Sequence, residues 1–393
     1  MIIQSEDRTM NHSRRHNTLS VLIPDGDTPG AIKLLRCLGP EFNSYILSKQ
    51  STPLAKYSRF CCGHFVYNHS EDWLSNIREI ILTLRIDIVF PILEKAIELV
   101  IQHRSELSDM AAIPHLPSTD AFNIVRNKWT FYDYCLQHNL PVPPSVVIDD
   151  QTYDETNIVQ LPSPALLKPT TETGGGMGII IARSDAEQLA ALKRVRETKR
   201  QYIIQSYIPG DDLCLCGYCR NGEILKYTIQ KSLLSRDSDN YFGTQRAMDF
   251  VDDARVVEVC TRLTKALNWE GIICIDLRID NRDQSIMLLE VNPRIGHAVL
   301  GSLSAGINLP TLVCLDAKGM QSPDMRYTPT RYYHPKDSWR MLLPGRNHTH
   351  DTGRSHTALR YTLNDPLPDL VDLARRLRSR TFRKKSHAVR NEQ

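Results

Sequence analysis

No stretch of the 393-residue chain is apolar for long enough to span a membrane. The most apolar segment, residues 77–101, is interrupted by seven charged side chains, whereas a spanning helix needs about 20 mostly apolar residues. Residues 1–17 mix both charges and have none of the apolar core of a signal peptide. We therefore expect a cytoplasmic protein that does not insert into membranes.

The chain also lacks a strong net charge, since its formal value is +3. The basic residues concentrate in residues 375–393, where eight Lys or Arg accompany one acid, so residues 1–374 carry a net charge of −4. Composition thus gives no support for a nucleic-acid-binding role of the whole molecule, and we expect no such partner. For the basic end we predict a solvated helix, with a contact to nucleic acid or anionic lipid as the alternative.

Ten cysteines are too few for a disulfide scaffold in a chain of this length. Cys216 and Cys219 form a Cys-x-x-Cys pair with Cys214 nearby, but no second pair follows at the spacing of a four-ligand zinc site. We predict that these three cysteines are core residues of a strand.

The pattern of predicted helices and strands changes along the chain. Up to about residue 115, short strand-like runs such as residues 19–23 alternate with helical patterns such as residues 72–85. This alternation predicts a doubly wound parallel sheet, although no Gly-x-Gly-x-x-Gly follows the first strand. Beyond residue 160 strand-like runs dominate, with helical patterns starting at Ser184 and over residues 254–267.

A lysine followed by a glycine-rich loop is the first motif that carries chemistry. Lys168 ends an apolar run, and four of the five residues at 174–178 are glycines. Glycines let backbone N–H groups converge on phosphate oxygens, and the lysine adds a positive charge. The loop does not have the spacing of a Walker A motif, and a plain hairpin tip is the alternative. The loop residues expected to bind nucleotide are Gly174, Gly175, Gly176 and Met177.

A strand end followed by an acidic turn is the second motif. Adenine needs an apolar slot with backbone donors and acceptors at its edge, and a ribose needs a carboxylate a few residues away. Residues 205–212 offer both, although an ordinary acidic turn is the alternative. The expected adenine and ribose contacts are Gln205, Ser206, Tyr207, Ile208 and Asp212.

Acidic residues on two neighbouring strand-like runs form the third motif. Glu290 and Asn292 share one strand face because side chains alternate, and pairing with the preceding strand would bring Asp276 beside them. Three oxygen ligands suit Mg²⁺ bound together with phosphates, and Arg294 can neutralise a phosphoryl group in transfer. We predict a metal site at Asp276, Glu290 and Asn292, with Mn²⁺ as an alternative to Mg²⁺.

Taken in order, these motifs resemble the ATP-grasp superfamily, and most closely its carbamoyl phosphate synthetase-like and carboxylate–amine ligase branches. The resemblance covers about residues 20–320 and adds Lys128 as a further nucleotide-binding lysine. It implies a phosphate-contacting lysine on a central strand, for which Lys226 is our choice and Lys231 the alternative. At the hinge, the glutamate usual in the family is replaced by Gln205.

The resemblance implies a fold and a domain order. We expect an α/β, doubly wound N-terminal domain over residues 1–117, followed by a two-subdomain ATP-grasp fold of α+β type. Its small subdomain, with the glycine-rich loop, would cover residues 118–200, and its metal-bearing subdomain residues 201–325. Residues 326–393 would form an extension with the basic tail.

The resemblance also implies an activity. We expect an ATP-dependent ligase that joins a small carboxylate to an amine through an acyl phosphate, releasing ADP and phosphate. A carbamoyl phosphate synthetase-type kinase and a non-catalytic ATP-binding module are the alternatives. Asp25 and Glu94, near strand ends of the N-terminal domain, are candidate substrate-side acids, and a homodimer is the expected assembly.

Overall fold

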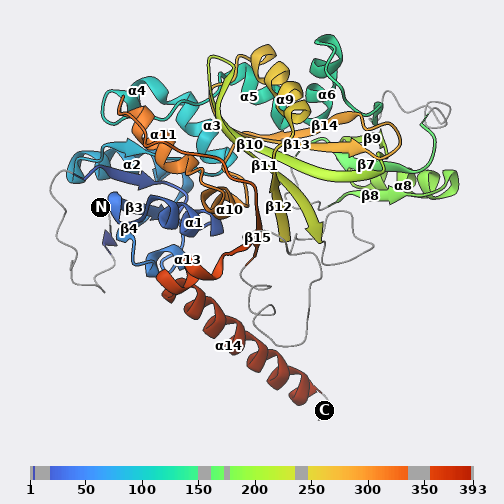
Figure 1. Cartoon of the computed structure of the whole chain (residues 1–393). Helices are drawn as coiled ribbons and strands as arrows, with labels where there is room; N and C mark the ends of the chain where they lie inside the picture. Colours follow the sequence, from blue (N-terminus) through green and yellow to red (C-terminus); the bar gives the residue numbers. More distant parts are fainter. Residues whose placement is uncertain are drawn as a thin grey trace. The chain divides into compact units, whose positions relative to one another are not determined.

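The computed structural model describes residues 3–4, 18–148, 161–171, 178–234, 247–334 and 355–390 (Figure 1). The chain divides into two compact units. The first comprises Met1–Pro114, Pro310–Asp324 and Thr357–Gln393, and the second His115–Leu309 and Met325–His356. Among the helices that the structure describes, none combines the length and apolar character needed to cross a bilayer.

The first unit contains a five-stranded sheet in the order β1-β4-β3-β2-β5. The three pairings β4-β3, β3-β2 and β2-β5 are parallel, and the edge strand β1 pairs with β4 in the antiparallel sense. Val21, Leu22 and Ile23 of β2 are fully buried, as expected for a strand covered on both faces. The predicted doubly wound sheet is therefore confirmed. The strands are β1 (Ile3–Gln4), β2 (Ser20–Ile23), β3 (Asn43–Ser48), β4 (Cys61–Val66) and β5 (Ile88–Val89).

Helices complete the first unit: α1 (Pro29–Leu38), α2 (Trp73–Leu84), α3 (Glu94–Gln102), α4 (Arg104–Ser108), α11 (Leu309–Ala317), α13 (Leu359–Asn364) and α14 (Leu367–Arg390). The turn between α13 and α14 is held by the buried carboxylate of Asp365. This carboxylate accepts hydrogen bonds from Arg36 at 3.1 Å, from the Ser58 hydroxyl at 2.9 Å and from the backbone N–H of Arg59 at 2.8 Å. A C-terminal segment is thereby tied to the N-terminal sheet domain.

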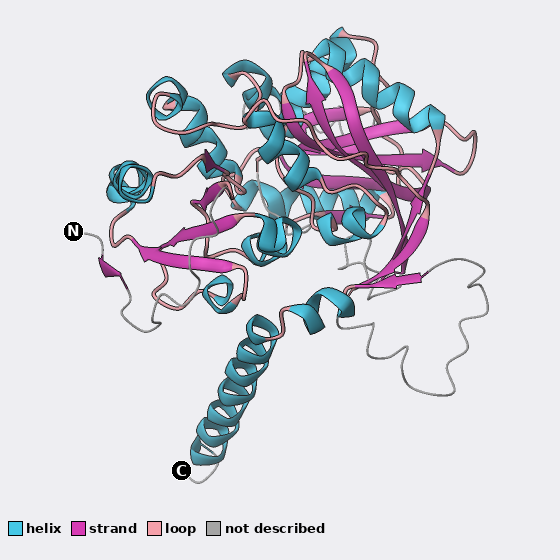
Figure 2. Cartoon of the chain, turned by 60° about the vertical axis from the view of Figure 1, so that its left-hand side comes forward, coloured by secondary structure: helices cyan, strands magenta, loops and turns pink. Residues whose placement is uncertain are grey.

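The second unit contains two antiparallel sheets (Figure 2). The smaller has the order β6-β9-β7-β8 and packs against α8 (Asp185–Glu197) through Ala191, Leu192 and Val195. The Ser184 hydroxyl caps α8 by accepting from the backbone N–H of Glu187, as its capping pattern predicts. The strands are β6 (Ser145–Ile148), β7 (Ala165–Pro169), β8 (Ile180–Ala182) and β9 (Tyr202–Ser206).

The larger sheet has the order β14-β13-β10-β11-β12-β15-β16. The strands are β10 (Gly210–Arg220), β11 (Glu223–Leu234), β12 (Ala247–Val251), β13 (Gly271–Asp280), β14 (Ile286–Asn292), β15 (Thr330–Tyr333) and β16 (Ser355–Thr357). The associated helices are α5 (Thr119–Arg126), α6 (Lys128–Gln137), α9 (Ala254–Ala266) and α10 (Val299–Ser304).

Alternation along β10 and β13 gives the larger sheet two chemically different faces. Odd-numbered residues such as Leu213, Ile275 and Leu277 enter an apolar core shared with α5, α6 and α9. The even-numbered residues therefore project from the opposite face. On that face Cys216 and Cys274 lie directly opposite each other and form a disulfide, which the sequence analysis did not predict, whereas Cys216 is buried as expected of a core residue.

Candidate functional site

Lys168 lies near the end of β7 with its ammonium group buried. Its side chain is only 5% exposed, and its Nζ donates to Gln205 Oε1 on the neighbouring strand β9 at 2.7 Å. Gln205 Nε2 in turn donates to the Ser145 hydroxyl on β6 at 3.0 Å. Burial lowers the pKa of Lys168 to about 8, an effect that the negative charge of Glu290 partly offsets. A buried ammonium of this kind is poised to accept an anionic partner.

Lys128 begins α6 and reaches the acidic residues of the larger sheet. Asn127 caps this helix by accepting from the backbone N–H groups of Trp129 and Thr130. The backbone N–H of Lys128 donates to Thr170 O at 2.8 Å, and its ammonium forms an ion pair with Glu290 Oε2 at 3.1 Å. The helix N-terminus thus holds a second lysine beside the end of the strand that carries Lys168.

The three predicted metal ligands come together on one hairpin. Asp276 of β13 is paired directly with Glu290 of β14, which confirms the pairing expected from their spacing. Asn292 Nδ2 donates to Asp276 Oδ2 at 3.1 Å, and Arg294 donates to Asn292 Oδ1 at 3.2 Å. The structure therefore brings all four of these residues into one hydrogen-bonded group.

The two carboxylates of this group have opposite pKa shifts. Burial, followed by the charge of Glu290, raises the pKa of Asp276 to about 7. Burial alone would also raise the pKa of Glu290, but the ammonium groups of Lys128 and Lys168 outweigh it and hold this pKa below its ordinary value. A cation near both carboxylates would favour their charged forms.

The donor set fits a hard divalent cation. Asp276, Glu290 and Asn292 offer two carboxylates and one amide oxygen, which are the ligands that Mg²⁺ prefers. The ammonium of Lys128 already places a positive charge 3.1 Å from Glu290. These residues would hold the metal, with phosphate oxygens completing its coordination.

Asp212, the predicted ribose contact, is held by an arginine that the sequence analysis did not single out. Arg278 is buried and forms an ion pair with Asp212 at 3.3 Å, and its guanidinium lies 5.4 Å from the centre of the Tyr207 ring. It also donates to Gly210 O at 2.8 Å. Asp212 has a raised pKa because of burial, although Arg278 and Lys168 both act against this shift. Arg278 could have been predicted from the sequence, because it lies two residues after Asp276 and therefore on the same face of the strand.

The predicted adenine contacts lie at the end of β9 and in the two residues after it. Ser206 ends β9, where its backbone N–H donates to Pro144 O at 2.9 Å, and the backbone N–H of Tyr207 donates to Pro164 O at 3.1 Å. Ile208 is buried. The predicted loop contacts lie outside the described residues: Gly174, Gly175, Gly176 and Met177.

The two candidate lysines of β11 lie on opposite faces of the larger sheet. Lys226 is paired with Tyr218, on the face of Asp276, about 13 Å along the strand from the Cys214 that pairs with Asp276. Its ammonium donates to Met325 O at 3.0 Å. Lys231 instead forms an ion pair with Asp211 at 2.7 Å on the other face. Lys226 thus shares a sheet face with Asp276 but not its row, and its contact with phosphate stays a prediction.

Gln230 is a further residue that the sequence analysis missed. It lies on β11 opposite Cys214, in the row of the sheet that continues to Asp276 and Glu290. Its side chain is buried, and its Nε2 makes no hydrogen bond to the residues that the structure describes. The sequence around Gln230 could not have predicted this position. Gln230 lies in the row of Asp276 only because β11 pairs with β10 and β10 pairs with β13.

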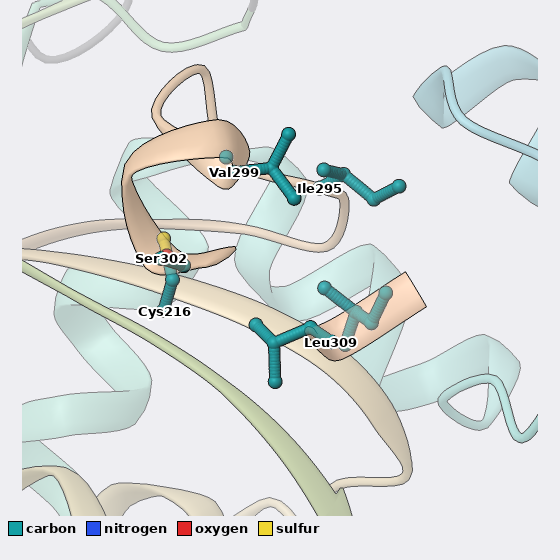
Figure 3. Close-up of a pocket in the computed structure, with 7 residues that line it drawn as sticks. Cys216, Ile295, Val299, Ser302 and Leu309 are labelled. Atoms are coloured by element: carbon teal, nitrogen blue, oxygen red, sulfur yellow. The ribbon is translucent and has the colours of Figure 1, made fainter. Parts of the chain in front are cut away.

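An apolar pocket lies against Ile295, the residue that directly follows Arg294 (Figure 3). Its lining includes Cys216, Ile295, Val299, Ser302 and Leu309, of which Ser302 bonds to the Thr228 hydroxyl at 2.8 Å. No lining residue is ionisable apart from the disulfide-bonded cysteine. This pocket therefore offers no charge to recognise a carboxylate or an amine.

The two candidate substrate-side acids lie in the first unit. Asp25 follows β2, and its Oδ2 accepts from the backbone N–H of Ile92 at 2.6 Å and of Leu93 at 3.2 Å. Burial raises its pKa to about 6, although these two hydrogen bonds act against the shift. Glu94 begins α3 directly after that segment. Both acids thus lie where β2 and β5 end, at the point where the strand order of the sheet reverses.

Comparison with known proteins identifies the class to which this site belongs. A family model described as an ATP-grasp domain matches residues 125–298, which include both lysines, the hinge and the acidic hairpin. This part of the chain, which is less than half of it, thus matches an ATP-grasp domain, as its motifs predict.

Named relatives and solved structures agree with this assignment. A D-aspartate ligase of Enterococcus faecium is 25% identical over 235 residues, which are 56% of this chain and 56% of that protein. The carbamoyl phosphate synthase large chain of Thermomicrobium roseum is 24% identical over 200 residues, 49% of this chain and 18% of the relative. The matches thus span from about a fifth to just over half of these relatives.

Among solved structures, the ADP complex of an N5-carboxyaminoimidazole ribonucleotide synthetase aligns with a TM-score of 0.63 at 14% identity. The alignment covers 79% of this chain and 80% of that one. At this identity the likeness concerns the fold, and it confirms the predicted combination of a parallel-sheet domain with an ATP-grasp fold.

Proposed function

We propose that this protein is an ATP-dependent ligase that joins a carboxylate to an amine. The observation that carries the proposal is the meeting of Lys128 and Lys168 with the carboxylates of Asp276 and Glu290 in an ATP-grasp domain. Two positive charges beside a metal-ligand set are what a triphosphate and its metal require. The name of the D-aspartate ligase relative supports the same class of reaction.

Binding of ATP would use residues from both sheets of the second unit and from the glycine-rich loop. Lys168 and Lys128 would contact the phosphates, together with the loop of Gly174, Gly175, Gly176 and Met177. The hinge from Gln205 to Ile208 would hold the adenine, and Asp212 would accept hydrogen bonds from the ribose hydroxyls. Arg278 would orient Asp212 through its 3.3 Å ion pair.

Asp276, Glu290 and Asn292 would hold Mg²⁺. When bound, the metal supplies charge neutralisation on the β- and γ-phosphates. Arg294, which already donates to Asn292, would stabilise charge on the transferred phosphoryl group. Lys226 is the proposed additional phosphate contact.

The reaction would proceed in two steps. A carboxylate oxygen of the substrate attacks the γ-phosphorus, the bond to the β-phosphate oxygen breaks, and ADP leaves. The amine nitrogen then attacks the acyl carbon, the carbon–oxygen bond to phosphate breaks, and the nitrogen loses a proton as the amide forms. The protein's part is to orient the reactants and neutralise charge. Asp25 and Glu94 are proposed to recognise the substrates, in a protein expected to be a homodimer.

ADP release from Mg-ATP with pools of carboxylates and amines tests the proposal. We expect ADP only when one carboxylate pool and one amine pool are both present. Glu290→Gln should lower this rate by about a hundredfold or more, because a charged metal ligand is lost. Glu223→Gln is the matched control, since Glu223 is an exposed glutamate of the same sheet whose partner is Lys265.

Other outcomes would favour the alternatives. ADP formed with bicarbonate or a carboxylate pool alone would indicate a carbamoyl phosphate synthetase-type kinase. Tight ATP binding without ADP release in any pool would indicate a non-catalytic module. Full activity of Glu290→Gln would contradict the proposed site.

A further inference from the structure

Helix α14 (Leu367–Arg390) is the last described element of the chain (Figure 1). Its two sides differ in their contacts and in their side chains. One side packs within the first unit. There Arg375 donates to Thr52 O at 2.7 Å, and its guanidinium lies 5.8 Å from the centre of the Tyr57 ring. The buried carboxylate of Asp365 fixes the start of the helix, as described above. The orientation of α14 on its unit is therefore defined by contacts of Arg375 and Asp365.

The side away from these contacts carries a row of leucines. Spacings of three and four residues place them on one face of the helix, since an α-helix turns by about 100° per residue. All are largely exposed, at 44%, 56%, 54% and 54% in chain order. We call this row the leucine stripe: Leu367, Leu370, Leu373 and Leu377.

Basic residues flank the leucine stripe. Residues 367–390 contain eight Lys or Arg and two Asp, a net charge of +6, whereas the whole chain carries +3. At about 100° per residue, Arg376 and Arg378 lie on the two sides of the stripe. An exposed apolar stripe between cationic side chains is the pattern of helices that lie in the plane of a lipid surface.

Charge decides among the surfaces that this helix could contact. A second copy of α14 would bring +6 against +6, which disfavours self-pairing. A nucleic acid would match the charge, but its phosphate backbone offers no apolar surface on which four exposed leucines could be buried. An anionic bilayer matches both features, because headgroups attract the arginines while the acyl boundary accepts the leucines.

We propose that α14 binds the surface of an anionic lipid bilayer through the leucine stripe and its flanking arginines. The helix would lie parallel to the membrane without crossing it. The proposal goes beyond the ligase activity, and it holds whether or not the enzyme proves to be a ligase.

Vesicle flotation with the full-length protein tests this. Phosphatidylcholine vesicles with phosphatidylglycerol should carry the protein, and vesicles of phosphatidylcholine alone should carry much less. Raising the salt from 0.1 M toward 1 M should weaken binding, as the screening length falls from about 10 Å to about 3 Å.

Serine variants test whether vesicle binding depends on the leucine stripe or on exposed leucines in general. Combining Leu370→Ser, Leu373→Ser and Leu377→Ser should lower partitioning by about tenfold or more, because three apolar side chains no longer enter the interface. The matched control combines serines at three leucines exposed elsewhere, and it should bind like the wild type: Leu82, Leu189 and Leu225. Circular dichroism and ATP binding should be unchanged in both triple variants.

Several results would overturn the proposal. One is equal wild-type binding to both vesicle types, or to neither. Another is an unchanged affinity of the stripe variant for anionic vesicles. A dimer in sedimentation velocity that the stripe variant abolishes would make this face a contact between copies of the chain. Binding to RNA with no vesicle binding would assign the basic residues to nucleic acid instead.

Discussion

Replacing Gln205 by glutamate should raise the pKa of the Lys168 ammonium and shift the pH at which ATP binding is lost. The Lys168 ammonium lies 2.7 Å from Gln205 Oε1, and burial lowers its pKa to about 8. A carboxylate at that distance favours the charged form of the lysine, and such pairs shift a pKa by roughly 1–3 units. We therefore expect the pKa of Lys168 in Gln205→Glu to rise to about 9–11.

The direction of the pH effect follows from the charge that ATP requires. Phosphate binds the protonated lysine, so affinity is highest below the pKa and falls as the pH rises through it. Between pH 7 and pH 9 the protonated fraction at a pKa of about 8 drops from roughly 0.9 to roughly 0.1. Wild-type affinity should thus fall about tenfold over this range, while that of Gln205→Glu should stay nearly constant.

Three companion variants complete the test: one should shift the pKa of Lys168 in the opposite direction, and two serve as controls. Gln205→Met removes the acceptor oxygen at similar length, so the pKa of Lys168 should drop below 8 and the loss should begin at lower pH. Ser145→Ala removes the partner of Gln205 Nε2 without touching the Lys168 contact, and the midpoint should stay close to that of the wild type. Lys168→Arg should abolish the transition, because a guanidinium stays charged.

Isothermal titration with ATP from about pH 6 to about pH 10 measures these midpoints. The midpoint is the readout, since a new carboxylate also repels phosphate and lowers affinity at every pH. An unchanged midpoint in Gln205→Glu, or shifts of the same sign in the glutamate and methionine variants, would refute the reasoning.

Three further substitutions test other contacts. Arg278→Met should weaken ATP binding by about tenfold or more in calorimetry, because the ribose-side acid loses its buried ion-pair partner; unchanged affinity would count against this role. Asp365→Ala should cost about 1–3 kcal/mol in urea unfolding, since Ser58 and the backbone N–H of Arg59 lose their buried acceptor while Arg36 keeps its ion pair with Asp369; a loss under about 0.5 kcal/mol would contradict this. Gly271→Ala should lower Tm by several degrees, because φ is +87° and the new Cβ would lie 2.1 Å from His115 O; an unaltered Tm would show that the backbone adapts.

The acidic hairpin shows how far local sequence could go. β13 and β14 are contiguous strands joined by a short turn, so their pairing followed from spacing and period-two alternation. Asp276 lies opposite Glu290 as predicted. The roles of these acids in metal binding stay predictions.

Contacts between distant segments were beyond this reasoning. Arg278 meets Asp212 only because β13 pairs with β10, and Gln230 joins the same face only through β11. The disulfide between Cys216 and Cys274 depends on that same pairing, across 58 residues of sequence. Strand β4 was also missed, because its Cys-Cys-Gly-His start shows little of the apolar run expected of a buried parallel strand.

Sequence by itself determined the class of the fold, the order of its motifs and the acidic hairpin. These depend on local periodicity and on neighbours in the chain, which pattern reasoning can read. Only the tertiary structure decided that Lys128 meets Glu290 at 3.1 Å and that Lys168 is buried against Gln205. Those contacts depend on how one helix and two sheets pack, and the pKa values at the site depend on the burial that this packing creates.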